Sequence, residues 1–206
     1  MAETDKANTE ERILEAAHEV FLQKGLDGAR MQEIADRAGI NKALLHYYFR
    51  SKDKLFQQII GRAVKVMLPR LTQVMNDEVD LFEKIRRVVD TYITFLSLNS
   101  YLPIFIINEI NRNPEHFAAH IVPVEKIALA TLQRQIDEAV AQGQIVPITV
   151  PQLLMNIISL CVFPFLGRPL LQLLFSLDKA AFKKEMDLRR TEVAEFIIRG
   201  LQPNKD

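Results

Sequence analysis

The 206-residue sequence has little glycine, a single cysteine and no net charge. Seven glycines, together with apolar residues at helical rather than alternating spacing, predict an all-α fold. The lone Cys161 excludes a disulfide framework or a cysteine-rich metal site within one chain. Because 26 basic residues balance 26 acidic ones, a signal for a nucleic-acid partner must come from where the charges lie.

Long apolar runs are also missing. The most apolar region, residues 153–177, is interrupted by Pro164, Gly167, Arg168 and Pro169. Neither part of it reaches the roughly 18–20 apolar residues that a membrane span needs. The polar and charged start of the chain differs from a secretory signal. We therefore expect a cytoplasmic protein without a membrane partner, in which the apolar region is a buried pair of helices.

The motifs of common enzyme classes are absent. The chain contains no G-x-G-x-x-G, P-loop, G-x-S-x-G or H-E-x-x-H sequence. His116 and His120 are spaced to share a helix face and could bind a metal, but no Glu-rich or Cys partner accompanies them. The sequence predicts neither an enzyme nor a metal or cofactor site.

Helical periodicity and end signals predict two parts that meet near residue 55, within one helix. Gly25, Gly39 and Gly143 are placed to end helices, and Asn41 and Ser51 are placed to cap them. The predicted helices cover residues 9–24, 31–38, 42–48, 52–75 (kinked near Pro69), 78–98, 103–112, 114–142 (broken near Pro123), 150–166, 169–176 and 178–201. We expect a smaller helical domain at 1–55 and a larger helical domain at 56–206.

Residues 32–56, QEIADRAGINKALLHYYFRSKDKLF, carry the clearest functional pattern. Two short predicted helices meet at a tight turn, Ala38-Gly39-Ile40, where glycine permits a positive φ. Residues 30–54 contain six basic and three acidic side chains, a local charge of +3. The predicted core of this region comprises Val20, Phe21, Ile34, Ala35, Ile40, Leu45 and Phe49. This core leaves the polar face of the 42–48 helix outward, with a size that fits a DNA major groove.

The same residues resemble the N-terminal signature of the TetR family of transcriptional regulators. The match covers about residues 11–56 and includes Ile34 to Lys42, Leu45 to Phe49 and Ser51 to Leu55. The resemblance implies an N-terminal three-helix helix-turn-helix domain that binds double-stranded DNA. The positions that it places at or near the DNA are Arg30, Gln32, Asn41, Lys42, Ala43, Leu44, His46, Tyr47, Tyr48 and Lys52.

Two positions depart from the family pattern. Ala29 and Arg30 stand where a Thr or Ser usually opens the second helix, so a cap is lost and Arg30 could replace a phosphate contact by its charge. His46 stands where tyrosine is usual. It could contact a base, or it could make DNA binding depend on pH, because imidazoles titrate near pH 6.5.

The larger part of the chain matches the family in length and helical pattern. The resemblance implies a homodimer on a palindromic operator and an unidentified, largely apolar effector. The predicted effector-binding residues are Phe95, Phe105, Asn108, Arg112, His116, Met155 and Phe163, although core packing is the alternative for the aromatic ones. The predicted dimer interface is Ile157, Ile158, Cys161, Phe165, Val193, Phe196, Ile197 and Leu201, with packing inside one chain as the alternative.

The predicted function is a repressor that leaves its operator when the effector binds. Activation stays open as an alternative. So does an architectural or division-control protein of the same fold that binds DNA but no small molecule.

Overall fold

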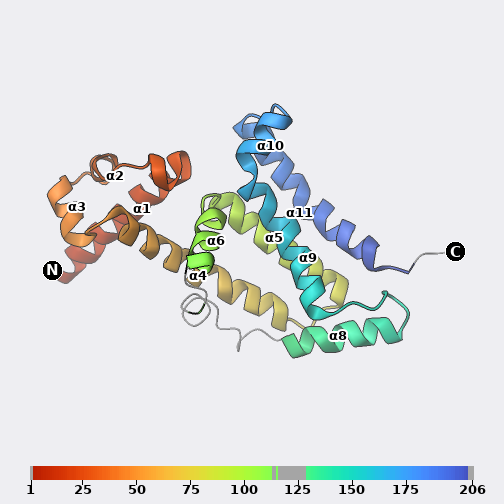
Figure 1. Ribbon diagram of the computed structural model, residues 1–206. Helices are drawn as coiled ribbons and strands as arrows, with labels where there is room; N and C mark the ends of the chain where they lie inside the picture. The colour runs from red at the N-terminus through yellow and green to blue at the C-terminus, as the bar shows by residue number, and fades with distance from the viewer. Residues whose placement is uncertain (1, 113–114, 116–128, 204–206) are drawn as a thin grey trace. The chain divides into compact units, whose positions relative to one another are not determined.

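The structure is a computed structural model that describes residues 2–112, 115 and 129–203 (Figure 1). All regular elements in these ranges are helices. The chain divides into two compact units, Met1–Lys65 and Val66–Asp206, and α4 (Lys52–Asn76) contributes to both. The predicted functional boundary near residue 55 falls in the same helix and stays a prediction.

The first unit contains α1 (Ala2–Gly28), α2 (Met31–Arg37), α3 (Lys42–Tyr48) and the start of α4. Gly25 interrupts α1 with a φ of 68°, as its predicted role as a helix end requires, and the chain then makes a further turn to Gly28. Gly39, with φ of 64°, occupies the tight turn after α2. The predicted core is confirmed for Val20, Phe21, Ile34, Ala35, Leu45 and Phe49, which are all buried, whereas Ile40 is half-buried.

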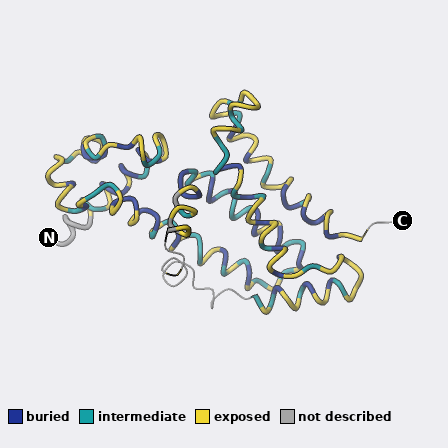
Figure 2. The backbone as a smooth tube through the Cα atoms, viewed as in Figure 1, coloured by how far each residue is buried: buried dark blue, intermediate teal, exposed yellow. Residues whose placement is uncertain are grey.

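The second unit is built around α5 (Leu81–Leu98), which packs against α9 (Val150–Leu166) and α11 (Lys179–Leu201). The dark-blue inner faces of these helices in Figure 2 show the shared core. The other helices of the unit are α6 (Leu102–Arg112), α8 (Leu129–Ala141) and the short α10 (Arg168–Leu174). Of the helix predicted over 114–142, the part that the structure describes is α8, and Gly143 follows it with a φ of 65°.

Side-chain caps fix where the main helices of this unit begin. The carboxylate of Asp80 accepts the backbone N–H of Glu83, and Asp178 accepts that of Ala181 in the same way. The Thr149 hydroxyl accepts the backbone N–H of Gln152 and caps α9.

One lysine is buried in the second unit. Lys84 is 1% exposed, and its ammonium donates to the backbone carbonyl of Met75, with Nζ and O 2.7 Å apart. Met75 lies in the last turn of α4, where carbonyls have no partner within the helix. Lys84 therefore caps the C-terminal end of α4 from inside the core. Burial lowers the pKa of Lys84, and the nearby Asp77 partly opposes this shift.

The apolar segment 150–174 forms the predicted two helices, but the prediction that both are buried is wrong for α10, none of whose residues is buried. No single helix within the described ranges is long and apolar enough to cross a membrane. Together α9 and α10 meet the length and composition for a span, but they bend by 70° where they join.

Candidate nucleic-acid interface

The third helix presents a polar face to solvent because its apolar side chains point inward. Leu45 is fully buried and Phe49, just after the helix, is 6% exposed. Tyr47 is 70% exposed, and its ring meets that of Tyr48 edge-on with centroids 5.6 Å apart. Tyr48 is half-buried, and the other predicted contact residues of this helix, Lys42, Ala43, Leu44 and His46, are exposed. The structure thus brings the predicted reading positions of α3 onto one exposed face.

The start of α3 is fixed by Asn41. Its side-chain oxygen accepts the backbone N–H of Leu44 at 2.8 Å, so the predicted cap is confirmed. This bond occupies the Oδ1 atom and leaves the amide N–H groups of Asn41 for the predicted DNA contact.

The turn before α3 is held by a residue that the sequence analysis did not single out. The guanidinium of Arg12, on α1, donates to the carbonyl of Ala38. A side chain at position 39 would approach Arg12 Nη2 to 2.9 Å, so glycine there serves both the positive φ and this contact. The predicted turn therefore depends on α1 as well as on its own sequence.

Four of the six basic side chains in residues 30–54 have cationic groups without a partner in the described part of the chain. Arg37 pairs with Glu19 at 2.8 Å, which neutralises one of the six predicted charges. The cationic groups of the following residues make no ion pair or hydrogen bond within the described part of the chain: Arg30, Lys42, Arg50 and Lys54. Uncompensated cations at a surface are what binding to phosphates requires.

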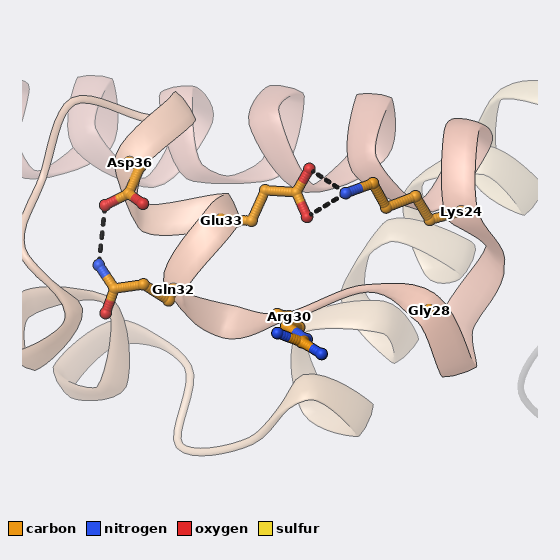
Figure 3. Close-up of a pocket in the computed structure, with 6 residues that line it drawn as sticks. All are labelled: Lys24, Gly28, Arg30, Gln32, Glu33 and Asp36. Carbon is orange, nitrogen blue, oxygen red and sulfur yellow. Dashed lines mark hydrogen bonds and ion pairs between the residues drawn. The ribbon is translucent and has the colours of Figure 1, made fainter.

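A shallow pocket of about 450 Å³ opens beside the N-terminal end of α2 (Figure 3). Arg30 lines it between Gly28 and Gln32, and the N-cap position that Arg30 occupies has no side-chain cap, as the sequence predicted. On one side Lys24 pairs with Glu33 at 2.8 Å. On the other the Gln32 amide donates to Asp36 at 2.7 Å. The role of Asp36 was missed, although its position four residues after Gln32 on a helix is the spacing that such a pair needs.

Lys52 has a different environment from the one expected of a phosphate contact. Its ammonium donates to the backbone carbonyls of Ala29, at 3.2 Å, and Asp27, at 3.4 Å. These bonds join the N-terminal end of α4 to the last turn of α1 and to Ala29, which precedes α2. The geometry assigns Lys52 a structural role in addition to any contact with DNA.

Of the seven predicted effector residues, the structure describes the side chains of four, and these differ in their burial. Phe95 is buried in α5, whereas Asn108, Met155 and Phe163 are exposed. Met155 and Phe163 lie on the outward side of α9, whose Leu153 side packs inward, and their role in effector binding stays a prediction. His116 lies outside the described residues, and the side chains of Phe105 and Arg112 are not described either.

The predicted dimer residues divide in a similar way. Ile158 is 43% exposed and Phe196 is 66% exposed, so both are available to a partner. The remaining six are buried within the single chain, which corrects their assignment to an interface: Ile157, Cys161, Phe165, Val193, Ile197 and Leu201. They form the faces by which α9 and α11 pack with α5. Burial also raises the pKa of the Cys161 thiol to about 12, as expected for a packed and unreactive side chain.

Comparison with known families confirms the resemblance. Residues 13–59 match the model of the bacterial regulatory proteins of the tetR family. Residues 82–197, more than half of the chain, match the tetracyclin repressor-like C-terminal domain. The chain therefore belongs to the TetR family, whose members are regulatory proteins and not enzymes.

Three curated relatives illustrate the range of this family. The chain is 34% identical over 89 residues to the transcriptional activator FasR of Mycolicibacterium smegmatis, covering 43% of this chain and 41% of FasR. It is 29% identical over 100 residues to the nucleoid occlusion factor SlmA of Vibrio vulnificus, covering 48% and 51%. It is 42% identical over 59 residues to the transcriptional repressor BepR of Brucella suis, covering 29% and 28%. These matches thus span about half or less of each relative.

A solved structure extends the likeness over the whole fold. A tetR-family regulatory protein from Rhodococcus has a TM-score of 0.67 at 19% identity, covering 96% of this chain and 98% of that one. At that identity the match shows the fold alone.

Proposed function

We propose that this protein is a homodimeric transcriptional repressor that binds a palindromic operator and is released by a small, largely apolar effector. The observation that carries the DNA-binding part is the exposed face of α3, with Lys42, His46 and Tyr47 on it. A seven-residue helix capped by Asn41 is short enough to enter a major groove and present its first residues to base edges.

The proposed dimer rests on exposed apolar side chains of two helices that contact each other, α9 and α11. Met155, Ile158 and Phe163 on α9 and Leu188 and Phe196 on α11 are each at least 43% exposed. Burial of such side chains against a second copy is favourable. A two-fold dimer would present two α3 helices to DNA, which is why we propose a palindromic site.

The sign of regulation is proposed from the reader domain. BepR, a repressor, is 42% identical over the 59 residues it shares with this chain. A repressor needs no more than occupancy of its operator, whereas an activator also needs a surface for the transcription machinery. Release by an effector requires that the effector bind the DNA-free state more tightly.

The experiment is selection of duplexes from a random pool by the purified protein, followed by anisotropy titration of the recovered sequence. We expect an inverted repeat, bound more tightly than a scrambled duplex and weakened by Lys42→Ala. Lys65→Ala is the matched control, because Lys65 is an exposed lysine outside the helix-turn-helix. Recovery of no consensus, or equal loss in both variants, would overturn the proposal.

A second candidate function follows from the match to SlmA, which is named a nucleoid occlusion factor. In this alternative the chain binds DNA without an effector. Small molecules would then leave the affinity of the protein for the selected duplex unchanged. Any effect of the protein on cell division would persist in strains that lack a promoter regulated by it.

A further inference from the structure

A second pocket, of about 450 Å³, lies in the larger unit where α9, α10 and α11 meet. Figure 1 shows α10 at the end of the α9 and α11 pair, where it forms one wall. The apolar side chains that line the pocket are Pro164, Leu171, Phe175, Leu177, Phe182 and Met186. Its size falls within the roughly 300–1,000 Å³ typical of small-molecule sites, which are mostly apolar with few polar anchors.

The polar anchor of this pocket is Arg189 on α11. Pro164 has no backbone N–H, so the carbonyl of Leu160, four residues earlier in α9, has no helical donor. Arg189 Nη2 donates to that carbonyl at 2.8 Å and is thereby fixed in place. Its Nε atom is buried and has no hydrogen-bond partner among the described residues. A buried, unpaired N–H of a cation is costly. Because Arg189 lines the pocket, its guanidinium offers a negatively charged oxygen there a charge-assisted bond.

The charge balance limits what the anion can be. Glu185, one turn before Arg189 on α11, also lines the pocket and forms no ion pair with Arg189 in the described structure. Among the lining residues, one positive and one negative group disfavour a phosphate or a dicarboxylate, because a second negative charge would meet Glu185. The guanidinium of Arg168 lies over the Phe182 ring, 4.9 Å from its centroid, but it donates to Gln172 and does not line the pocket. A single carboxylate attached to an apolar body fits both the arginine and the lining.

We propose that this pocket binds an amphipathic monocarboxylate, with the carboxylate on Arg189 and the apolar tail among Leu171, Phe175 and Phe182. The inference rests on the proposed function in one respect, that this molecule is the effector. The binding site itself follows from the apolar lining of the pocket and from Arg189. The predicted effector residues Phe95, Asn108 and Met155 are not part of it.

The test uses the fact that the sequence contains no tryptophan. Phe175→Trp in the full-length protein places a single indole in the pocket wall. The probe is 10-bromodecanoate, whose bromine quenches tryptophan fluorescence on contact. We expect saturable quenching, and we expect the uncharged analogue 10-bromodecan-1-ol to bind at least about tenfold more weakly because it lacks the charge-assisted bond.

Variants of the arginine localise the carboxylate. In the Phe175→Trp protein, Arg189→Gln keeps a donor for the Leu160 carbonyl but removes the charge, and we expect it to weaken 10-bromodecanoate by roughly tenfold or more. Arg199→Gln is the matched control on the same helix, outside the pocket lining, and should leave the affinity unchanged. If Arg189→Gln loses its helical circular dichroism, Arg189→Lys replaces it and should retain the preference for the acid over the alcohol.

Absence of saturable quenching, equal affinity for acid and alcohol, or equal affinity in Arg189→Gln and the parent would each overturn the proposal. The titration contains no DNA. Binding of 10-bromodecanoate can therefore be observed even if the protein is not released from an operator. Conversely, binding can be absent although the protein still binds and leaves its operator, so the two proposals are judged separately.

Discussion

The amide of Gln32 donates a hydrogen bond to the carboxylate of Asp36, with Nε2 and Oδ1 2.7 Å apart. Both residues lie on α2, one turn apart, and both are exposed. The bond fixes which end of the amide carries the oxygen, and it leaves one N–H and the carbonyl of Gln32 free. That is the donor and acceptor pair by which a glutamine reads adenine.

We therefore predict that Asp36→Ala relaxes sequence discrimination at the base pair that Gln32 reads. A bidentate contact contributes about 1–3 kcal/mol of discrimination, so the ratio of affinities for the correct and the substituted base should fall roughly fivefold or more. Removal of an acidic charge also raises affinity for every duplex. Asp53→Ala, which removes an exposed acid from the same unit, separates the two effects. Equal affinity ratios in the two variants would exclude an orienting role for Asp36.

A second prediction concerns Lys42, whose ammonium has no partner within the described part of the chain. If it contacts a phosphate, Lys42→Ala should weaken binding to all duplexes and reduce the slope of log K against log salt by about 1. If it contacts a guanine, discrimination at one base pair should fall instead, by about 1–3 kcal/mol. An anisotropy titration at four salt concentrations, with the operator and a scrambled duplex, distinguishes these contacts. No change in either quantity would remove Lys42 from the interface.

Lys52 should behave differently from Lys42, because its ammonium is bonded to the carbonyls of Asp27 and Ala29. Lys52→Ala leaves these carbonyls without that donor and frees the loop before α2. We expect a loss of about 1–3 kcal/mol in the stability of the first unit, measured by hydrogen exchange of its amides. Lys54→Ala, two residues along the same helix, is the control and should leave exchange unchanged. Unchanged hydrogen exchange in Lys52→Ala would contradict this structural role and leave contact with DNA as the role of Lys52.

The contrast between Lys42 and Lys52 shows which features of the site can be predicted from the sequence. The bounds of α3 were predictable as Lys42–Tyr48, because Asn41 and Gly39 mark its start by local rules. The partners of Lys52 were not predictable, since Asp27 and Ala29 lie more than twenty residues away and meet it only in the fold. The same holds for α9: the Ile157 and Ile158 sides are both apolar, and only the position of α5 decides which is buried.

The exposed faces of α9 and α11 lead to a prediction about association. Phe196→Glu places a charge on the proposed dimer face and should shift the protein to monomers in analytical ultracentrifugation at micromolar concentration, with its helical content intact. Leu98→Glu is the control, because Leu98 is 63% exposed at the end of α5 and outside both helices. Val193→Glu, by contrast, should unfold the second unit, because Val193 is 4% exposed in its core. A dimer that survives Phe196→Glu would place the interface elsewhere.

The buried Lys84 should give the second unit a pH-dependent stability. Its pKa is lowered in the folded state, mainly by burial, so between that value and the ordinary value near 10.5 the unfolded chain holds more protons. The free energy of unfolding must then rise with pH across this window. The stability that deprotonated Lys84 contributes above the window is lost as pH falls through the folded-state pKa.

Lys84→Met removes the titrating group and also deprives the Met75 carbonyl of its donor. We expect the variant to be less stable by about 1–3 kcal/mol near neutral pH, because a buried acceptor is left unsatisfied. The gap to the parent should widen between pH 7 and pH 10, since only the parent gains stability there. Guanidinium unfolding at both pH values, followed by circular dichroism, measures this, with the exposed Lys183→Met as control. A gap that stays constant would mean that Lys84 keeps its proton across the whole range.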